Sequence, residues 1–388
     1  MTFGKILLQR NLYFLLVGLF VTGCRVKTTL TLSSSHYLVI SDSLIITLDS
    51  LTYPYSKNIH FKDSILFIQN EGTNTVSLYS LSGKKICVYD FGRLKDVNKN
   101  FKINAAWFIS PDTILVYSST TNYTYLFDHT LKIIDSIEMP NNENLDNQMK
   151  TPLPYISTAQ LPIFNKGELY TTGYSIGERE VIDEKKSFVV AKADKNEIRY
   201  FVNYPLEYSG KDWGGIYYRM VYNCTIGDSI MCISFPASSS IALFNIRDKS
   251  VNYQSTFPDI SQYIQPYGEK VKPGFNKLKI AEHFYGQYSF RGIIFDKYRN
   301  LFYRFLLKPT GKEYLKKDHM GPQGKYLLVY DSHFKYLGYT ELDKTFSHFS
   351  YFVTQKGLYI QRLKNSADED HICFSIFTVN SINQLQTQ

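Results

Sequence analysis

Lys62-Asp63-Ser64-Ile65-Leu66-Phe67-Ile68 reads as a tight turn followed by an apolar strand, and this pattern recurs along the chain. Asp and Ser favour turns, whereas β-branched and aromatic residues favour strands. Further copies occupy residues 111–117, 166–170, 227–233, 299–303 and 356–360. Helical periodicity is nearly absent between them. Six copies of one local unit therefore predict an all-β repeat architecture.

Most copies are followed by a third and a fourth strand around another turn. After the first copy, residues 76–79 and 85–89 flank Ser82-Gly83. After the second copy, residues 125–128 and 133–137 form a similar pair. Four antiparallel strands per unit, at a period near 50 residues, are typical of propeller blades. We therefore predict a six-bladed β-propeller of four-stranded antiparallel blades, with seven blades or a β-sandwich as alternatives.

The last unit, residues 352–379, lacks its fourth strand. Residues 37–40 and 44–48 are apolar, strand-like and not assigned to any unit. We expect a strand from this N-terminal region to pair with residues 374–379 and to complete the last blade. Such closure would remove a free sheet edge, which otherwise invites aggregation.

The N-terminus has the layout of a secretory signal peptide, with Lys5 and Arg10 before an apolar run of about ten residues. This run is shorter than the ~20 residues that a membrane-spanning helix needs. Val21-Thr22-Gly23-Cys24 follows and resembles the lipobox of bacterial lipoproteins. The resemblance implies cleavage before Cys24 and attachment of lipid to its thiol. We predict a lipoprotein signal peptide (1–23), a short tether (24–36) and one propeller domain (37–388).

Taken together, the lipobox and the six degenerate blades resemble the uncharacterised six-bladed β-propeller lipoproteins of the Bacteroidetes type. The resemblance covers essentially the whole mature chain, but the activity of these proteins is unknown and implies no catalytic residues. Arg25-Val26-Lys27 follows Cys24, without the Asp of inner-membrane retention or the acidic residues of surface export. We therefore expect a lipid anchor in the outer membrane, facing the periplasm.

The composition and the spacing of reactive residues limit the kinds of partner and site that the sequence can provide. Aromatic residues make up 16% of the chain, with 32 Tyr and 27 Phe, which favours β-structure. The net charge of +8 comes without a long basic block, so no nucleic acid partner is expected. The eight histidines are scattered and form no metal-binding motif, so neither a metal nor a cofactor is predicted. Gly173-Tyr174-Ser175-Ile176-Gly177 matches a nucleophile motif but lacks a following helix, so we predict no catalytic residue.

Two cysteines, Cys224 and Cys232, flank the turn Gly227-Asp228. A two-residue turn would place Cys224 opposite Met231 and would point Cys232 to the other face of the sheet. Although an exported protein could form disulfides, this register predicts that both cysteines remain free thiols.

Five long insertions interrupt the strand pattern, at residues 94–104, 141–160, 207–219, 258–287 and 308–324. Four of them precede the first strand of a blade, and such connections gather on one face of a propeller. Two of these loops hold aromatic residues beside an arginine. Aromatic faces stack on sugars or apolar side chains, and arginine binds carboxylates. The predicted ligand-binding residues are Trp213, Tyr217, Arg219, Tyr285 and Arg291. Packing of these residues between blades is the alternative.

The sequence thus predicts a binding or scaffold module attached to a membrane through its N-terminal lipid. Its partner would be a glycan, a peptide or an envelope protein. The alternative is an enzyme acting on polysaccharide or peptidoglycan, with two carboxylates ~5–10 Å apart at the channel mouth.

Overall fold

The computed structural model describes residues 30–32, 36–49, 52, 54, 56, 58–70, 72–96, 101–110, 112–139, 152–175, 182, 185, 187–195, 197–267, 277–311, 321–322, 324–363 and 370–380. Residues 1–31 and residues 32–388 form two separate units, and the fold described below belongs to the second. The predicted lipid-attachment residue, Cys24, lies outside the described residues.

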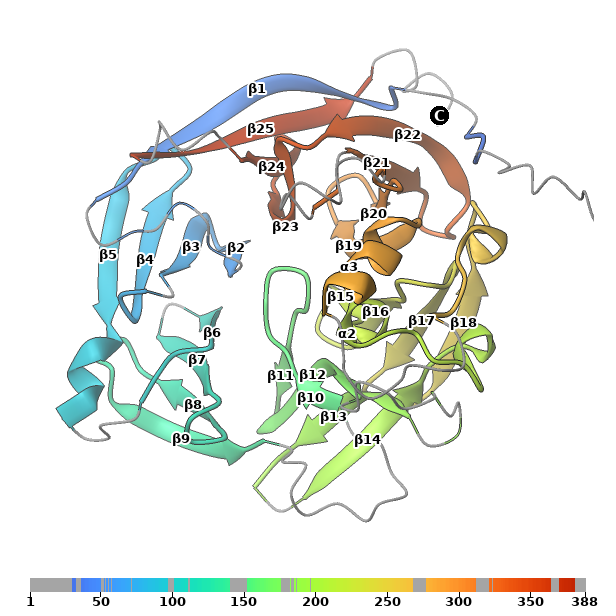
Figure 1. The fold of residues 1–388 in the computed structure, drawn as a ribbon. Coiled ribbons are helices and arrows are strands. Elements are labelled where there is room, and N and C mark those ends of the chain that lie inside the picture. Colours follow the sequence, from blue (N-terminus) through green and yellow to red (C-terminus); the bar gives the residue numbers. More distant parts are fainter. Residues whose placement is uncertain are drawn as a thin grey trace, which may run out of the picture. The chain divides into compact units, whose positions relative to one another are not determined.

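Each predicted turn joins the first two strands of an antiparallel sheet, and six such sheets surround a central axis (Figure 1). Blades 1 and 2 consist of β2 (Ile59–Lys62), β3 (Ile65–Asn70), β4 (Thr75–Ser80), β5 (Lys85–Asp90), β6 (Ala105–Ser110), β7 (Thr113–Ser118), β8 (Tyr123–Phe127) and β9 (Ile133–Glu138). Blade 3 consists of β10 (Pro152–Pro154), β11 (Ile163–Asn165), β12 (Glu168–Ser175), β13 (Phe188–Ala193) and β14 (Ile198–Asn203). The six-bladed β-propeller prediction is confirmed.

The remaining blades continue the ring in chain order. Blades 4 and 5 consist of β15 (Tyr222–Ile226), β16 (Ile230–Ser234), β17 (Ser240–Asn245), β18 (Val251–Ser255), β19 (Ser289–Asp296), β20 (Leu301–Leu307), β21 (Gly324–Tyr330) and β22 (Tyr336–Asp343). Blade 6 consists of β23 (Phe346–Val353), β24 (Leu358–Arg362), β25 (His371–Val379) and β1 (Leu38–Thr47). Its strand order, β1-β25-β24-β23, places the N-terminal strand on the outside.

Strand β1 closes the ring as the sequence predicts. It pairs antiparallel with β25, from Leu38 opposite Val379 to Thr47 opposite His371. Along β1, Ile46 is fully buried whereas the neighbouring Ile45 is 55% exposed, which is the alternation of a strand with one buried face. The buried side packs in one hydrophobic cluster with residues of blades 1 and 6. Both ends of the described propeller therefore belong to the same blade.

The first turns are tight because their residues tolerate a left-handed backbone. Asp63 and Ser64, between β2 and β3, have φ angles of 50° and 64°. Two consecutive positive φ values match the hairpin turn whose twist suits antiparallel strands. Lys166 and Gly167, between β11 and β12, repeat the arrangement with φ angles of 53° and 80°. These turns lie at the ends of the inner strands, and we call this side of the propeller the turn face.

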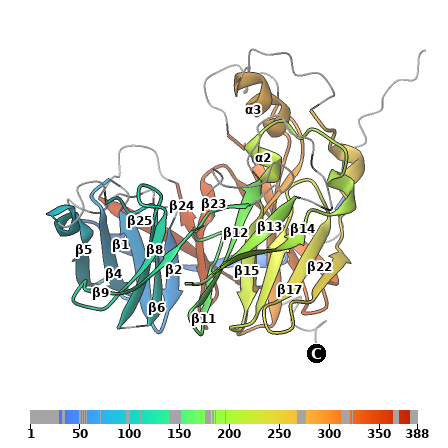
Figure 2. The same cartoon turned by 90° about the horizontal axis from the view of Figure 1, so that it is seen from below.

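Short helices lie on the opposite side, which we call the loop face (Figure 2). The described helices are η1 (Phe91–Asp96), η3 (Leu206–Tyr208), α2 (Ile216–Arg219), η4 (Ser261–Tyr263) and α3 (Lys277–Tyr285). Helices α2 and α3 stand before the inner strands β15 and β19, at the end away from the first turns. None of the described helices combines the length and the apolarity that crossing a membrane requires.

The hydrophobic core lies between neighbouring blades, and one buried arginine adds polar bonds to it. Arg304 of β20 is fully buried and uses all its donor nitrogens on blade 4 and the chain that leaves it. Its Nε donates to Ser234 Oγ, and its two terminal nitrogens donate to three backbone carbonyls and to Thr256 Oγ1. Because every donor has an acceptor, this charge is accommodated and fixes blade 5 against blade 4.

The predicted register of the two cysteines is wrong. The turn between β15 and β16 contains three residues rather than two, so that Ile226 pairs with Ile230 and Cys224 lies directly opposite Cys232. Both side chains are therefore on the same face of the sheet, because paired residues point the same way. Both are buried free thiols, as predicted, although the reason given from the register does not hold.

Candidate functional site

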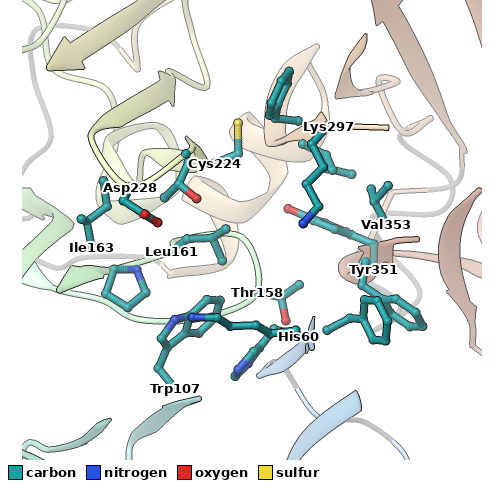
Figure 3. Close-up of a pocket in the computed structure, with 18 of the residues that line it drawn as sticks. His60, Trp107, Thr158, Leu161, Ile163, Cys224, Asp228, Lys297, Tyr351 and Val353 are labelled. Atoms are coloured by element: carbon teal, nitrogen blue, oxygen red, sulfur yellow. The ribbon is translucent and has the colours of Figure 1, made fainter. Parts of the chain in front are cut away.

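A pocket of ≈ 390 Å³ lies on the propeller axis, and its lining includes Asp228 and Lys297 from first turns on the turn face (Figure 3). Inner strands of all six blades line it: β2, β6, β11, β15, β19 and β23. Its volume falls within the range of ~300–1,000 Å³ that is typical of small-molecule sites. We call this cavity the axial pocket.

Residues 155–162, which we call the plug segment, contribute Thr158, Leu161 and Pro162 to the lining of the axial pocket. This segment leaves blade 3 between β10 and β11 and reaches the centre of the ring (Figure 1). Thr158 holds it to blade 1, because its Oγ1 accepts the N–H of Ile59 and donates to the carbonyl of the same residue, both at 2.7 Å. On the other side, the carbonyl of Ala159 accepts the N–H of Asn223 in blade 4 at 2.9 Å. The plug segment thus spans the channel.

An aromatic pair forms part of the pocket wall. The rings of His60 and Trp107 are stacked with centroids 3.8 Å apart. His60 Nε2 accepts the backbone N–H of Phe108 at 2.9 Å. Burial lowers the pKa of His60 well below 6.5, and the nearby charge of Lys62 lowers it further. His60 is therefore neutral at pH 7 and carries its proton on Nδ1, for which the described residues offer no acceptor.

Three exposed charged residues stand at the rim of the axial pocket: Lys62, Asp228 and Lys297. Lys62 Nζ donates to the carbonyl of Ile109 in blade 2, which holds this cation in place. Asp228 and Lys297 belong to the first turns of blades 4 and 5 and form no ion pair with any residue that the structure describes. Lys297 Nζ lies 5.2 Å from the ring centroid of Tyr298. The rim therefore presents both signs of charge to solvent.

The residues predicted from the sequence lie on the loop face, away from the axial pocket. Tyr217 of α2 stacks on Phe284 of α3 with centroids 5.1 Å apart, and lies 6.1 Å from the ring of Tyr285. The guanidinium of Arg291 lies 4.5 Å from the ring centroid of Phe284. The structure thus brings Tyr217, Tyr285 and Arg291 together around Phe284. Tyr217 and Tyr285 are half-buried, and ligand binding there stays a prediction.

Trp213, Arg219 and Arg291 are buried, with 3%, 1% and 4% of their surface exposed. Trp213 Nε1 donates to the carbonyl of Tyr208 at 3.2 Å. Arg291 donates through Nη1 to the hydroxyl of Tyr222, and burial lowers its pKa to about 10. These contacts are the inter-blade and loop packing that the sequence left open as the alternative.

A family model matches residues 35–341, which is most of the chain, and its description is "domain of unknown function (DUF4221)". The chain belongs to the DUF4221 family. The solved structure of a DUF4221 member from Bacteroides vulgatus is similar, with 18% identity and a TM-score of 0.67 over 88% of this chain and 98% of that one. A Bacteroides fragilis protein described as exported is similar at 11% identity and a TM-score of 0.51, over 91% and 98%. No curated protein matches the chain.

The axial pocket lies largely within the DUF4221 match. The matched residues include the plug segment and the rim residues Lys62, Asp228 and Lys297, whereas β23 lies beyond residue 341. At these low identities the two solved structures support the fold alone. The site must therefore be argued from the residues of this chain.

Sequence reasoning missed the axial pocket of this DUF4221 protein. Lys62 and Asp228 stand in or beside the turns that predict the fold, and a turn pattern indicates local structure rather than a binding site. Their position at the inner end of each blade is the signal that could have placed them at a channel mouth. Trp107 gives no such signal, because it lies inside a strand with no polar residue of note beside it. The plug segment overlaps the predicted insertion 141–160, and nothing in the sequence indicates that it reaches the axis.

The pair of carboxylates that the enzyme alternative requires is not found among the described residues that line the axial pocket of this DUF4221 protein. Asp228 is the one carboxylate among the residues that line the axial pocket in the described part of the chain. Hydrolysis of a glycosidic bond by two carboxylates needs a second. Among those same residues, no group of three or more His, Cys, Asp or Glu side chains is arranged to hold a metal ion.

Proposed function

We propose that this DUF4221 protein is a lipid-anchored binding module of the cell envelope, which holds its ligand in the axial pocket. One observation carries the proposal: a pocket at the axis that is lined by inner strands of six blades and by the plug segment, which Thr158 holds in place. Preformed concave sites with apolar walls and a few polar groups are the usual form of small-molecule sites. The ligand is a glycan, a peptide or part of an envelope protein small enough to enter this pocket.

The location in the envelope is supported by two observations. Val21-Thr22-Gly23-Cys24 has the form of a lipobox, and a structurally similar protein of Bacteroides fragilis is described as exported. The residues after Cys24 lack the acidic signals of inner-membrane retention and of surface export. We therefore place the protein on the outer membrane, facing the periplasm.

Replacing Cys24 by Ala is expected to move the protein from the membrane fraction to the soluble fraction, or to leave its leader uncut. The thiol of Cys24 is the attachment point in this proposal, and each buried CH₂ of an acyl chain contributes ~0.8 kcal/mol to anchoring. Metabolic labelling with a fatty acid measures the outcome. Cys87→Ala is the control and should keep both label and fractionation. Label retained in Cys24→Ala would contradict the anchor.

Filling the axial pocket is expected to remove the ligand without unfolding the propeller. Thr225 lines the pocket from β15 and is half-buried, so that a Trp at this position projects its ring into the cavity. We expect envelope compounds that co-purify with the wild type to fall at least about tenfold in Thr225→Trp, as for loss of a central contact. Mass spectrometry of the extracted protein measures this.

Asn252→Trp is the control, because Asn252 is exposed on the outer strand β18. If Thr225→Trp does not fold, Val353→Trp on β23 tests the same pocket from blade 6. Equal recovery of compounds from the wild type and from a folded pocket variant would overturn the proposal. Recovery of a chemically altered compound would favour the enzyme alternative.

A further inference from the structure

Two opposite charges on neighbouring blades face the mouth of the axial pocket without neutralising each other. Asp228 stands in the first turn of blade 4 and Lys297 in the first turn of blade 5. Their side chains reach toward the pocket from different sides (Figure 3). Neither forms an ion pair with a described residue. A ligand that carries both signs of charge would complement this rim, whereas a simple anion would meet Asp228 as a repulsive neighbour.

Apolar and aromatic side chains make up part of the interior below the rim. Ile163, Ile293 and Ile294 line it as buried aliphatic side chains, and Phe352 adds a buried ring. Trp107 is half-buried and stands beside these residues in the wall. Such walls stabilise an apolar side chain by removing its surface from water, at ~25 cal/mol per Å².

From this combination we propose that the axial pocket binds an α-amino acid with a large apolar side chain. The α-ammonium donates to the carboxylate of Asp228, the α-carboxylate accepts from Lys297, and the side chain extends down the axis beside Trp107. Lys62, held by the carbonyl of Ile109, adds a second positive charge at the rim. The inference rests on the proposed function, because it names the ligand class of that same pocket.

Binding of L-phenylalanine and its two singly charged analogues tests the assignment. The analogues are 3-phenylpropanoate, which lacks the ammonium, and phenethylamine, which lacks the carboxylate. Isothermal titration of the detergent-solubilised full chain at pH 7 and low salt measures each Kd. We expect Asp228→Asn to weaken phenylalanine at least about tenfold and not to weaken 3-phenylpropanoate, because the lost carboxylate repels this anion. We expect Lys297→Gln to weaken phenylalanine at least about tenfold, and phenethylamine less than about twofold.

Two control variants change equivalent charges outside the pocket. Asp112 and Lys356 stand in the first turns of blades 2 and 6 and do not line the cavity. Asp112→Asn and Lys356→Gln should leave the affinity for phenylalanine within about twofold, since exposed charges at a distance are screened. If these controls lose as much affinity for phenylalanine as the pocket variants, the effect comes from the overall charge of the turn face. That result would overturn the inference.

The inference is overturned if the wild type does not bind phenylalanine at millimolar concentration. It is equally overturned if glucuronate, an acidic sugar, binds more tightly, or if Asp228→Asn leaves phenylalanine binding unchanged. These failures are distinct from failure of the proposed function. If Thr225→Trp still loses the co-purifying compounds, the pocket is a binding site and only the ligand class is wrong.

Discussion

Deletion of strand β1, residues 38–47, is expected to abolish the cooperative unfolding transition of the propeller. Strand β1 pairs along its whole length with β25, and its inner side chains pack against blades 1 and 6. Its removal exposes the edge of β25 and the cluster beneath it, and a hydrophobic free edge favours aggregation. Circular dichroism during heating measures the transition. A deletion variant with the melting temperature of the complete protein would contradict closure.

Two neighbouring residues of β1 give a matched pair for the same prediction. Ile46 is fully buried, whereas Ile45 is 55% exposed on the other face of the strand. We expect Ile46→Ala to lower the free energy of unfolding by about 2–5 kcal/mol, through lost burial and a cavity. Ile45→Ala should change it by about 0.5 kcal/mol or less, as is usual for surface positions. Equal effects of the two substitutions would mean that β1 does not bury one face.

Trp213→Ala is expected to lower the free energy of unfolding by about 3–5 kcal/mol. The indole is 3% exposed and packs edge-on against Tyr218, with ring centroids 5.6 Å apart. It also lies 4.8 Å from the ring of Tyr208 and donates to that residue's carbonyl. Substitution by Ala therefore leaves a large cavity on the loop face and one acceptor without its donor. Chemical denaturation of the purified variant measures the loss.

Two further variants separate packing from ligand binding at this site. Trp213→Phe keeps an aromatic ring and should cost about 1 kcal/mol, for the lost hydrogen bond. Tyr217→Ala removes a half-buried ring at the same loop and should affect stability less than Trp213→Ala. If Trp213→Ala retained full stability but lost ligand binding, the loop face would be the binding site and Trp213 one of its contacts.

The blades were predictable because each turn depends on local backbone preference. Their closure was predictable because it requires only a count of the strands in each unit. Asp63-Ser64 and the turns like it specify tight hairpins through backbone preference, so each copy predicts a strand pair without knowledge of the rest. Closure followed from the last unit's missing fourth strand and the unassigned strands near the N-terminus. Neither inference needed any long-range side-chain contact. This is why the fold could be derived from a single sequence.

The axial pocket and the register of β15 needed information that one sequence does not carry. The plug segment is positioned by Thr158 against Ile59, a contact between residues 99 apart in the chain. No local preference of residues 155–162 specifies that contact. The turn between β15 and β16 could close with two or three residues, and the choice decides whether Cys224 faces Met231 or Cys232. Pairing along the whole sheet makes that choice.

The predicted loop residues illustrate a different limit. Trp213, Arg219 and Arg291 have the chemistry of binding residues, yet all three are buried in this fold. Residue type cannot distinguish an arginine that faces a ligand from one that lies over Phe284 and donates to Tyr222. Exposure distinguishes them, and exposure is a property of the assembled blades. The candidate binding residues at the pocket rim are exposed because the assembled blades place them there: Lys62, Asp228 and Lys297.

The pairing of β1 with β25 also has a consequence for synthesis. The ribosome makes β1 before every other strand of the propeller and makes β25 last, so β1 has no partner until the last strand of the propeller has been made. Pairing of segments so distant in sequence is slow, because a long loop must close first. A chain that stops before His371 lacks the whole of β25 and leaves both β1 and β24 with an open edge. Truncated products are therefore marked by exposed strand edges, which chaperones and proteases can recognise.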